Sequence, residues 1–122
     1  MALPSSITLN VGSPAADVVF NTSSPQGNER IYYADSPNGD LAGRIKLRVS
    51  HETSKSGIAR SLVQFRKPIA NADGDYDTIV QVNMVATRPE TAALTDVDEV
   101  LEMAEEVLAV TDVRASIGGL IV

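Results

Sequence analysis

One stretch near the middle of the chain constrains the fold more than any other, because its residue types alternate strictly. From Arg44 to Ser50 every second residue is apolar, and the residues between are cationic or polar. Successive side chains of a β-strand point to opposite faces of the sheet. The stretch therefore predicts a strand with one apolar face and one cationic or polar face. The residues expected on the second face are Arg44, Lys46, Arg48 and Ser50.

Two further long segments, 58–67 and 78–88, have the same period of two and predict strands of the same kind. Pro68 is expected to end the first of them. Alternation gives one face of these segments to Arg60, Leu62, Gln64 and Arg66, and to Gln81, Asn83 and Val85. Shorter strands are expected over 6–11, 17–20 and 30–33, the first two as a hairpin.

After Pro89 the apolar residues recur at spacings of three and four, which is typical of an amphipathic helix. Thr95 is the expected N-cap, and the acids that follow it suit the positive end of the helix dipole. Residues 112–118 could form a short second helix. About six antiparallel strands followed by one or two helices indicate an α+β fold. The apolar stripe of the long helix consists of Val97, Val100, Leu101, Ala104, Val107 and Leu108.

The helix is too short to cover the apolar face of the expected sheet. A helix of about 14 residues spans ~21 Å, whereas five strands make a sheet roughly 24 Å wide and comparably long. The uncovered apolar area predicts a homodimer in which each subunit's helices cover part of the other's sheet. The stripe and Ile117 are the expected dimer contacts. The cationic face is then left open.

The distribution of charge matters more than the net charge of −6. Seven of the ten Lys and Arg residues lie between Arg44 and Lys67, where Glu52 is the only acid. Eight of the sixteen acids lie from Glu90 onward, on the helical part. The cationic face could be simple solvated surface, but solvated faces usually mix both signs. We interpret it as a surface for a polyanion, with an affinity that falls steeply with salt.

The order and spacing of these elements resemble the coat proteins of the leviviruses, which are single-stranded RNA bacteriophages. The best local carriers of the resemblance are Val82-Asn83-Met84, Lys67-Pro68, the alternation from Ile45 to Val49, and Ala115-Ser116-Ile117. It covers nearly the whole chain as a single coat-protein domain over 1–122. It implies an N-terminal β-hairpin (1–22), a five-stranded antiparallel sheet (29–88) and two C-terminal helices (95–120) that interlock in a homodimer.

The resemblance also implies a function and a set of RNA-binding residues. Dimers would close into an icosahedral shell in the bacterial host cytoplasm, and the protein would reside in the virion. The inner sheet face would bind hairpins of the genomic single-stranded RNA, for packaging and translational repression. Two residues depart from the family pattern, because Val85 replaces a frequent polar residue and Gln81 replaces a tyrosine that stacks on a base in some members. The implied RNA-facing positions are Lys46, Arg48, Ser50, Arg60, Leu62, Gln64, Arg66, Gln81, Asn83 and Val85.

Other functions find less support in the sequence. The chain has no cysteine, and its one histidine, His51, lies in a predicted loop, so no catalytic residue, metal or cofactor is expected. Asp73, Asp75 and Asp77 are spaced like a calcium loop, but the later glutamate is missing, which leaves a weak cation site as an alternative to an ordinary turn. The apolar segments are too short for a membrane partner. A dimeric RNA-binding regulator that does not assemble is the main alternative, and a small enzyme that uses carboxylates is the third.

Overall fold

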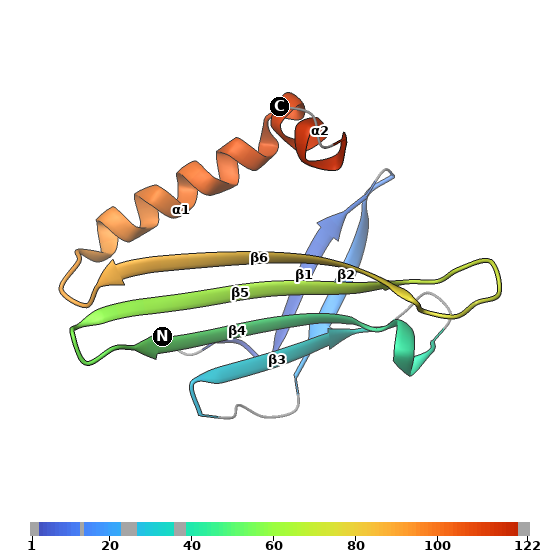
Figure 1. Cartoon of the computed structure of the whole chain (residues 1–122), viewed down its shortest axis with the longest axis horizontal. Helices are drawn as coiled ribbons and strands as arrows, with labels where there is room; N and C mark the ends of the chain where they lie inside the picture. The colour runs from blue at the N-terminus through green and yellow to red at the C-terminus, as the bar shows by residue number, and fades with distance from the viewer. Residues whose placement is uncertain (1–2, 13, 23–26, 36–38, 120–122) are drawn as a thin grey trace. The chain divides into compact units, whose positions relative to one another are not determined.

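The computed structural model describes residues 3–12, 14–22, 27–35 and 39–119. The chain divides into two compact units, 1–87 and 88–122, which are described separately. Within the described part of the first unit, six strands form one sheet in the order of the sequence (Figure 1). They are β1 (Ser6–Val11), β2 (Ala16–Asn21), β3 (Glu29–Ala34), β4 (Ile45–Thr53), β5 (Ile58–Ile69) and β6 (Thr78–Pro89), with the 3₁₀ turn η1 (Leu41–Gly43) before β4.

The pairing of β4 with β5 sets the geometry of the whole sheet. The turn between them is closed by hydrogen bonds from the Ser54 N–H to the Ile58 carbonyl (2.9 Å) and from the Gly57 N–H to the Ser54 carbonyl (3.1 Å). Gly57 has φ 81°, a left-handed conformation that glycine adopts without steric cost. The turn fixes an antiparallel register in which Lys46 is opposite Arg66.

Two details of the strand prediction are wrong. Strand β5 continues through Pro68 to Ile69. Pro68 lies beyond the last residue paired with β4, so its missing N–H leaves no bond to β4 unmade. His51 lies within β4, where it is paired with Ser61, and not in a loop.

The segment 29–88 supplies four strands of the described sheet rather than five. Residues 70–77 form a tight turn between β5 and β6 and leave no room for another strand. The Asn71 amide oxygen accepts hydrogen bonds from the N–H groups of Asp73 (2.9 Å) and Asp75 (3.0 Å). The N-terminal hairpin joins the same sheet through the pair Asn21 and Tyr33, which brings the total to six strands.

The core lies between the hairpin and the apolar face of β3 and β4. Tyr32 and Leu47 are almost fully buried there, and Ile7, Leu9 and Val18 of the hairpin pack against the cluster. In Figure 1, β1 and β2 accordingly pass behind the longer strands. The hairpin therefore covers part of the apolar face that the sequence analysis left for a partner. The buried core residues are Phe20, Tyr32, Ala34, Leu47 and Val49.

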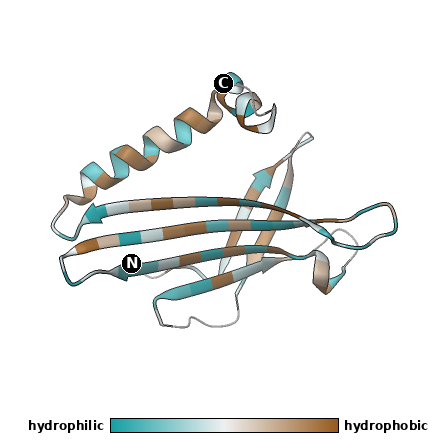
Figure 2. Cartoon of the chain, in the orientation of Figure 1, coloured by the Kyte–Doolittle hydropathy of each residue, from teal (hydrophilic) through white to brown (hydrophobic). Residues whose placement is uncertain are grey.

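The second unit contains the two predicted helices, α1 (Leu94–Ala109) and α2 (Thr111–Gly119). The predicted N-cap is wrong, because α1 begins at Leu94 and Thr95 lies in its first turn. Ala93 holds the cap position with backbone bonds alone. Apolar bands alternate with polar ones along α1 (Figure 2), and none of its residues is buried in the single chain. Neither described helix combines the length and hydropathy that a membrane crossing requires.

Candidate nucleic-acid interface

The strand register brings the predicted RNA-facing residues of β4 and β5 onto one face. Lys46 is opposite Arg66, and Arg48 is opposite Gln64. Directly opposed residues of an antiparallel pair share a face. We call this surface the cationic face. Its members on β4 and β5 are Lys46, Arg48, Ser50, Glu52, Arg60, Leu62, Gln64 and Arg66.

Strand β6 extends the cationic face by a side-chain hydrogen bond. The Gln64 amide nitrogen donates to the Asn83 amide oxygen at 2.9 Å, so Asn83 lies on the same face. Alternation along β6 places Gln81 and Val85 beside it, and Val85 is 58% exposed. Of the predicted positions, Arg44 alone lies outside the strands, since it directly follows η1 and precedes β4.

Strand β3 adds residues to this face that the sequence analysis did not assign. Ile31 is opposite Arg48, and Tyr33 is opposite Lys46. The Arg44 guanidinium lies over the Tyr33 ring, 4.2 Å from its centroid, in a cation–π contact. Its neighbour Tyr32 is buried in the core, so Tyr33 points to the opposite side. No clear signal for this was present in the sequence, because alternation groups Tyr33 with Ile31 and Tyr32 with Arg30.

Charge on this face is less uniform than the sequence suggested. Glu29 of β3 forms an ion pair with Arg48, and Glu52 forms one with Arg60 at 3.4 Å. The sequence did not indicate Glu29 as a member of this face, because it is far from Arg48 along the chain. The pairing of β3 with β4 makes the two residues neighbours. Both pairs are partly or largely exposed, so each contributes at most about 1 kcal/mol to stability.

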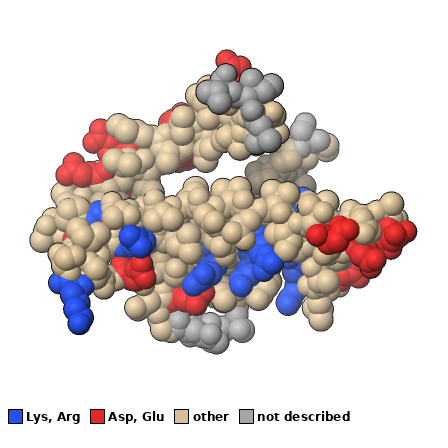
Figure 3. All heavy atoms as spheres, viewed as in Figure 1, with Lys and Arg blue, Asp and Glu red and all other residues tan. Residues whose placement is uncertain are grey.

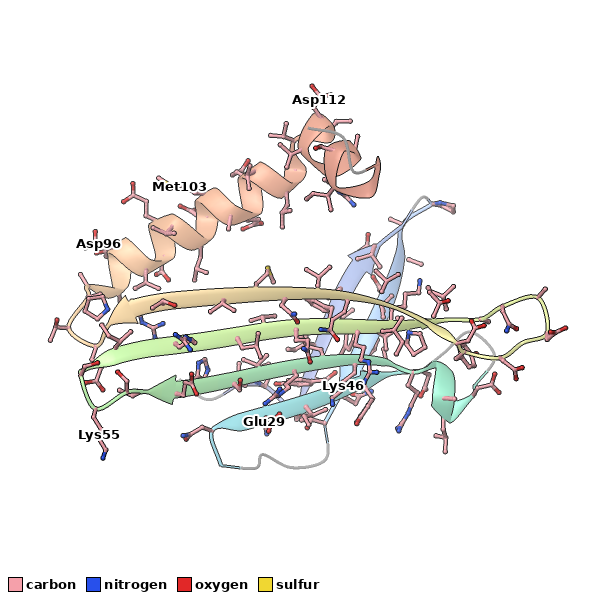
Figure 4. The ribbon with its side chains drawn as sticks, viewed as in Figure 1. Glu29, Lys46, Lys55, Asp96, Met103 and Asp112 are labelled. Atoms are coloured by element: carbon pink, nitrogen blue, oxygen red, sulfur yellow. The ribbon has the colours of Figure 1, made fainter. Side chains whose placement is uncertain are left out.

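The unpaired positive charge is concentrated toward one end of the face. Lys46 and Arg66 are opposite each other, and no carboxylate of the described residues lies within ion-pair distance of either. Figure 3 shows Lys and Arg gathered over the middle of the strands, and Asp and Glu gathered at the loop between β5 and β6. Lys46 and Glu29 are labelled on neighbouring strands in Figure 4. Lys46 and Arg66 are therefore the opposed cations of β4 and β5 whose charge no described ion pair neutralises, and the acids of the β5–β6 loop lie beyond them.

The other face of the sheet is apolar and only partly covered. Across β3 and β4 it is buried by the hairpin, but on β6 Val80, Val82 and Met84 remain 55%, 51% and 39% exposed. The predicted dimer contacts on the helices are also open. Val97 is half-buried, and Val100, Leu101, Ala104, Val107, Leu108 and Ile117 are exposed. Each unit therefore carries an uncovered apolar surface.

The aspartates near residue 75 are explained by turn chemistry. Asp73 and Asp75 hydrogen-bond to Asn71 through their backbone N–H groups, and the Asp77 carboxylate accepts a bond from the Asn71 amide at 3.1 Å. Asp77 directly precedes β6, which begins at Thr78 as the period of two predicted. Across the described ranges, no group of three His, Asp or Glu side chains is arranged to hold a metal ion.

Comparison with known proteins finds the same fold in phage shells. No family model matches the sequence, and no curated protein matches it. The virus-like particle of bacteriophage ESE058 matches with a TM-score of 0.81 at 16% identity, over 99% of each chain. The protein capsid of bacteriophage GA matches with a TM-score of 0.75 at 11% identity, over 96% of this chain and 95% of that one. An unassembled phage coat protein dimer, described as RNA-binding, matches with a TM-score of 0.74 at 13% identity, over 96% of this chain and 94% of that one. The chain therefore has the fold of single-stranded RNA phage coat proteins, and the fold class implied by the sequence resemblance is confirmed.

Proposed function

We propose that this chain is the capsid subunit of a single-stranded RNA bacteriophage, which forms homodimers that close into an icosahedral shell. The observation that carries the proposal is the division of one sheet into an apolar and a cationic face, within a fold shared with phage coat proteins over nearly its full length. Such a subunit would be assembled in the bacterial host cytoplasm and would remain in the virion. The proposal includes no catalytic step.

The partner for the uncovered apolar surfaces is a second copy of this chain. The apolar face of β6 and the stripe of α1 each expose several large aliphatic side chains, which a monomer would leave in water. A two-fold axis lets each copy offer both surfaces at once. A phage coat protein of the same fold has been solved as a dimer, which supports this choice of partner.

The proposed ligand of the cationic face is the genomic RNA. Lys46 and Arg66 offer charge to phosphates, and the affinity would depend steeply on salt. Gln64 and Asn83 carry amides that can read the edges of unstacked bases in a hairpin loop. Binding of this kind would serve packaging and, where the hairpin overlaps a translation start, repression. Val85 and Leu62 would give apolar contacts on the same face.

Electron microscopy of the purified full-length protein tests assembly directly. We expect uniform closed shells, because shell closure requires only repeated contacts between identical dimers. Nucleic acid recovered from those shells should be RNA. A protein that stays a free dimer at high concentration, and that binds RNA in that form, would instead support the non-assembling regulator.

A further inference from the structure

An open hollow of about 330 Å³ lies at one end of the cationic face. Its volume is at the lower end of the range for sites that hold small ligands. Three cations and two tyrosines contribute to its lining, together with three small or apolar residues. The residues that matter for recognition are Tyr33, Arg44, Lys46, Arg66 and Tyr76.

Arg44 is held in place on two sides. Its guanidinium lies 4.2 Å from the centroid of the Tyr33 ring, and its Nε donates to the Leu41 carbonyl at 3.4 Å. At this distance the guanidinium contacts the face of the Tyr33 ring. Planar guanidinium groups and aromatic rings are the surfaces on which unpaired bases stack. The hollow thus combines a stacking platform with two further cations, Lys46 and Arg66.

Tyr76 completes the hollow from the turn before β6. Its hydroxyl donates to the Asp40 carboxylate at 3.1 Å, which ties that turn to the segment leading into η1. The contact holds the Tyr76 ring in the lining of the hollow, and the Asp40 carboxylate accepts that hydrogen bond.

We propose that this hollow binds one unpaired nucleotide of single-stranded RNA, with the base stacked on the Arg44–Tyr33 pair and the phosphate held by Lys46 and Arg66. This inference rests on the proposed RNA binding and adds a subsite to it, away from the amide pair of Gln64 and Asn83. Aromatic residues are few in this chain, but Tyr33 and Tyr76 both line this hollow among its cations.

The test uses a short single-stranded RNA that carries one fluorescent 2-aminopurine, titrated into the purified full-length protein. Stacking quenches this base, so binding should lower its fluorescence. Arg44→Lys keeps the charge but removes the planar group. We expect this variant to lose the quenching and to bind about tenfold more weakly, with an unchanged salt slope. Tyr33→Ala should do the same, and Tyr33→Phe should behave like the wild type.

Arg114→Lys is the matched control, since it makes the same change in α2, which contributes no residue to the cationic face. It should leave both the quenching and the affinity unchanged. If Arg44→Lys and Tyr33→Ala both keep the quenching and the affinity of the wild-type protein, the proposed subsite is wrong. The proposed function would still stand. If the wild-type protein binds no RNA at all, the RNA part of the proposed function fails, and the subsite fails with it.

Discussion

Ala104→Asp is expected to abolish self-association and with it shell formation. Ala104 is central in the apolar stripe of α1 and is exposed in the single chain. In a dimer that covers the stripe, the new carboxylate would be buried without a partner, at a cost of about 3 to 5 kcal/mol. A two-fold interface contains the change twice. The dimer should therefore dissociate more than about 10⁴-fold more readily, as measured by sedimentation equilibrium.

Ala109→Asp provides the matched control for this prediction. It makes the same substitution in the same helix, about 140° away from Ala104 around the helix axis. We expect this variant to retain the dimer and the shells, with a loss of stability below about 1 kcal/mol from the unfavourable end of the helix dipole. Equal effects of the two substitutions would mean that the apolar stripe of α1 is not the interface.

The double variant Lys46→Ala and Arg66→Ala is expected to show the largest loss of RNA affinity. These cations are opposite each other, and neither forms an ion pair with a described carboxylate. Each phosphate contact with single-stranded RNA contributes about 0.7 to the slope of log affinity against log salt. Two lost contacts should make the slope shallower by about 1.4 per engaged subunit, and affinity near 0.1 M salt should fall at least about tenfold. Filter binding over a salt series measures both quantities.

The double variant Arg48→Ala and Arg60→Ala is the matched control, because it removes the same amount of charge from the same two strands. Because Glu29 and Glu52 already pair with these arginines, their replacement should change affinity and salt slope less. The dimer should remain intact in both double variants. If the Arg48 and Arg60 variant loses as much RNA affinity as the Lys46 and Arg66 variant, the ion pairs do not reduce the contribution of Arg48 and Arg60 to RNA binding.

The faces of the long strands were predictable from the sequence because alternation is a local property. Lys46 and Leu47 must point to opposite sides of any strand that contains both. Which residues meet across strands is not local, and this explains what was missed. Tyr33 and Glu29 reach the cationic face through the register of β3 with β4, which no pattern within β3 specifies.

The boundaries of elements were less predictable for the same reason. Pro68 was expected to stop β5, but the pairing with β4 ends before it, so the missing N–H leaves no bond to β4 unmade. Thr95 was expected to cap α1, but backbone bonds to the Ala93 carbonyl start the helix two residues earlier. In each case the surroundings of the residue, and not its local preference, set the boundary.

Lysine reactivity, mapped by acetylation and mass spectrometry with and without bound RNA, tests the two-faced sheet most directly. The chain has three lysines: Lys46 is on the cationic face, Lys55 is in the β4–β5 turn, and Lys67 follows Arg66 and so points to the opposite face. We expect RNA to protect Lys46 and to leave Lys55 and Lys67 as reactive as before. Protection of Lys67 with an unprotected Lys46 would contradict the account.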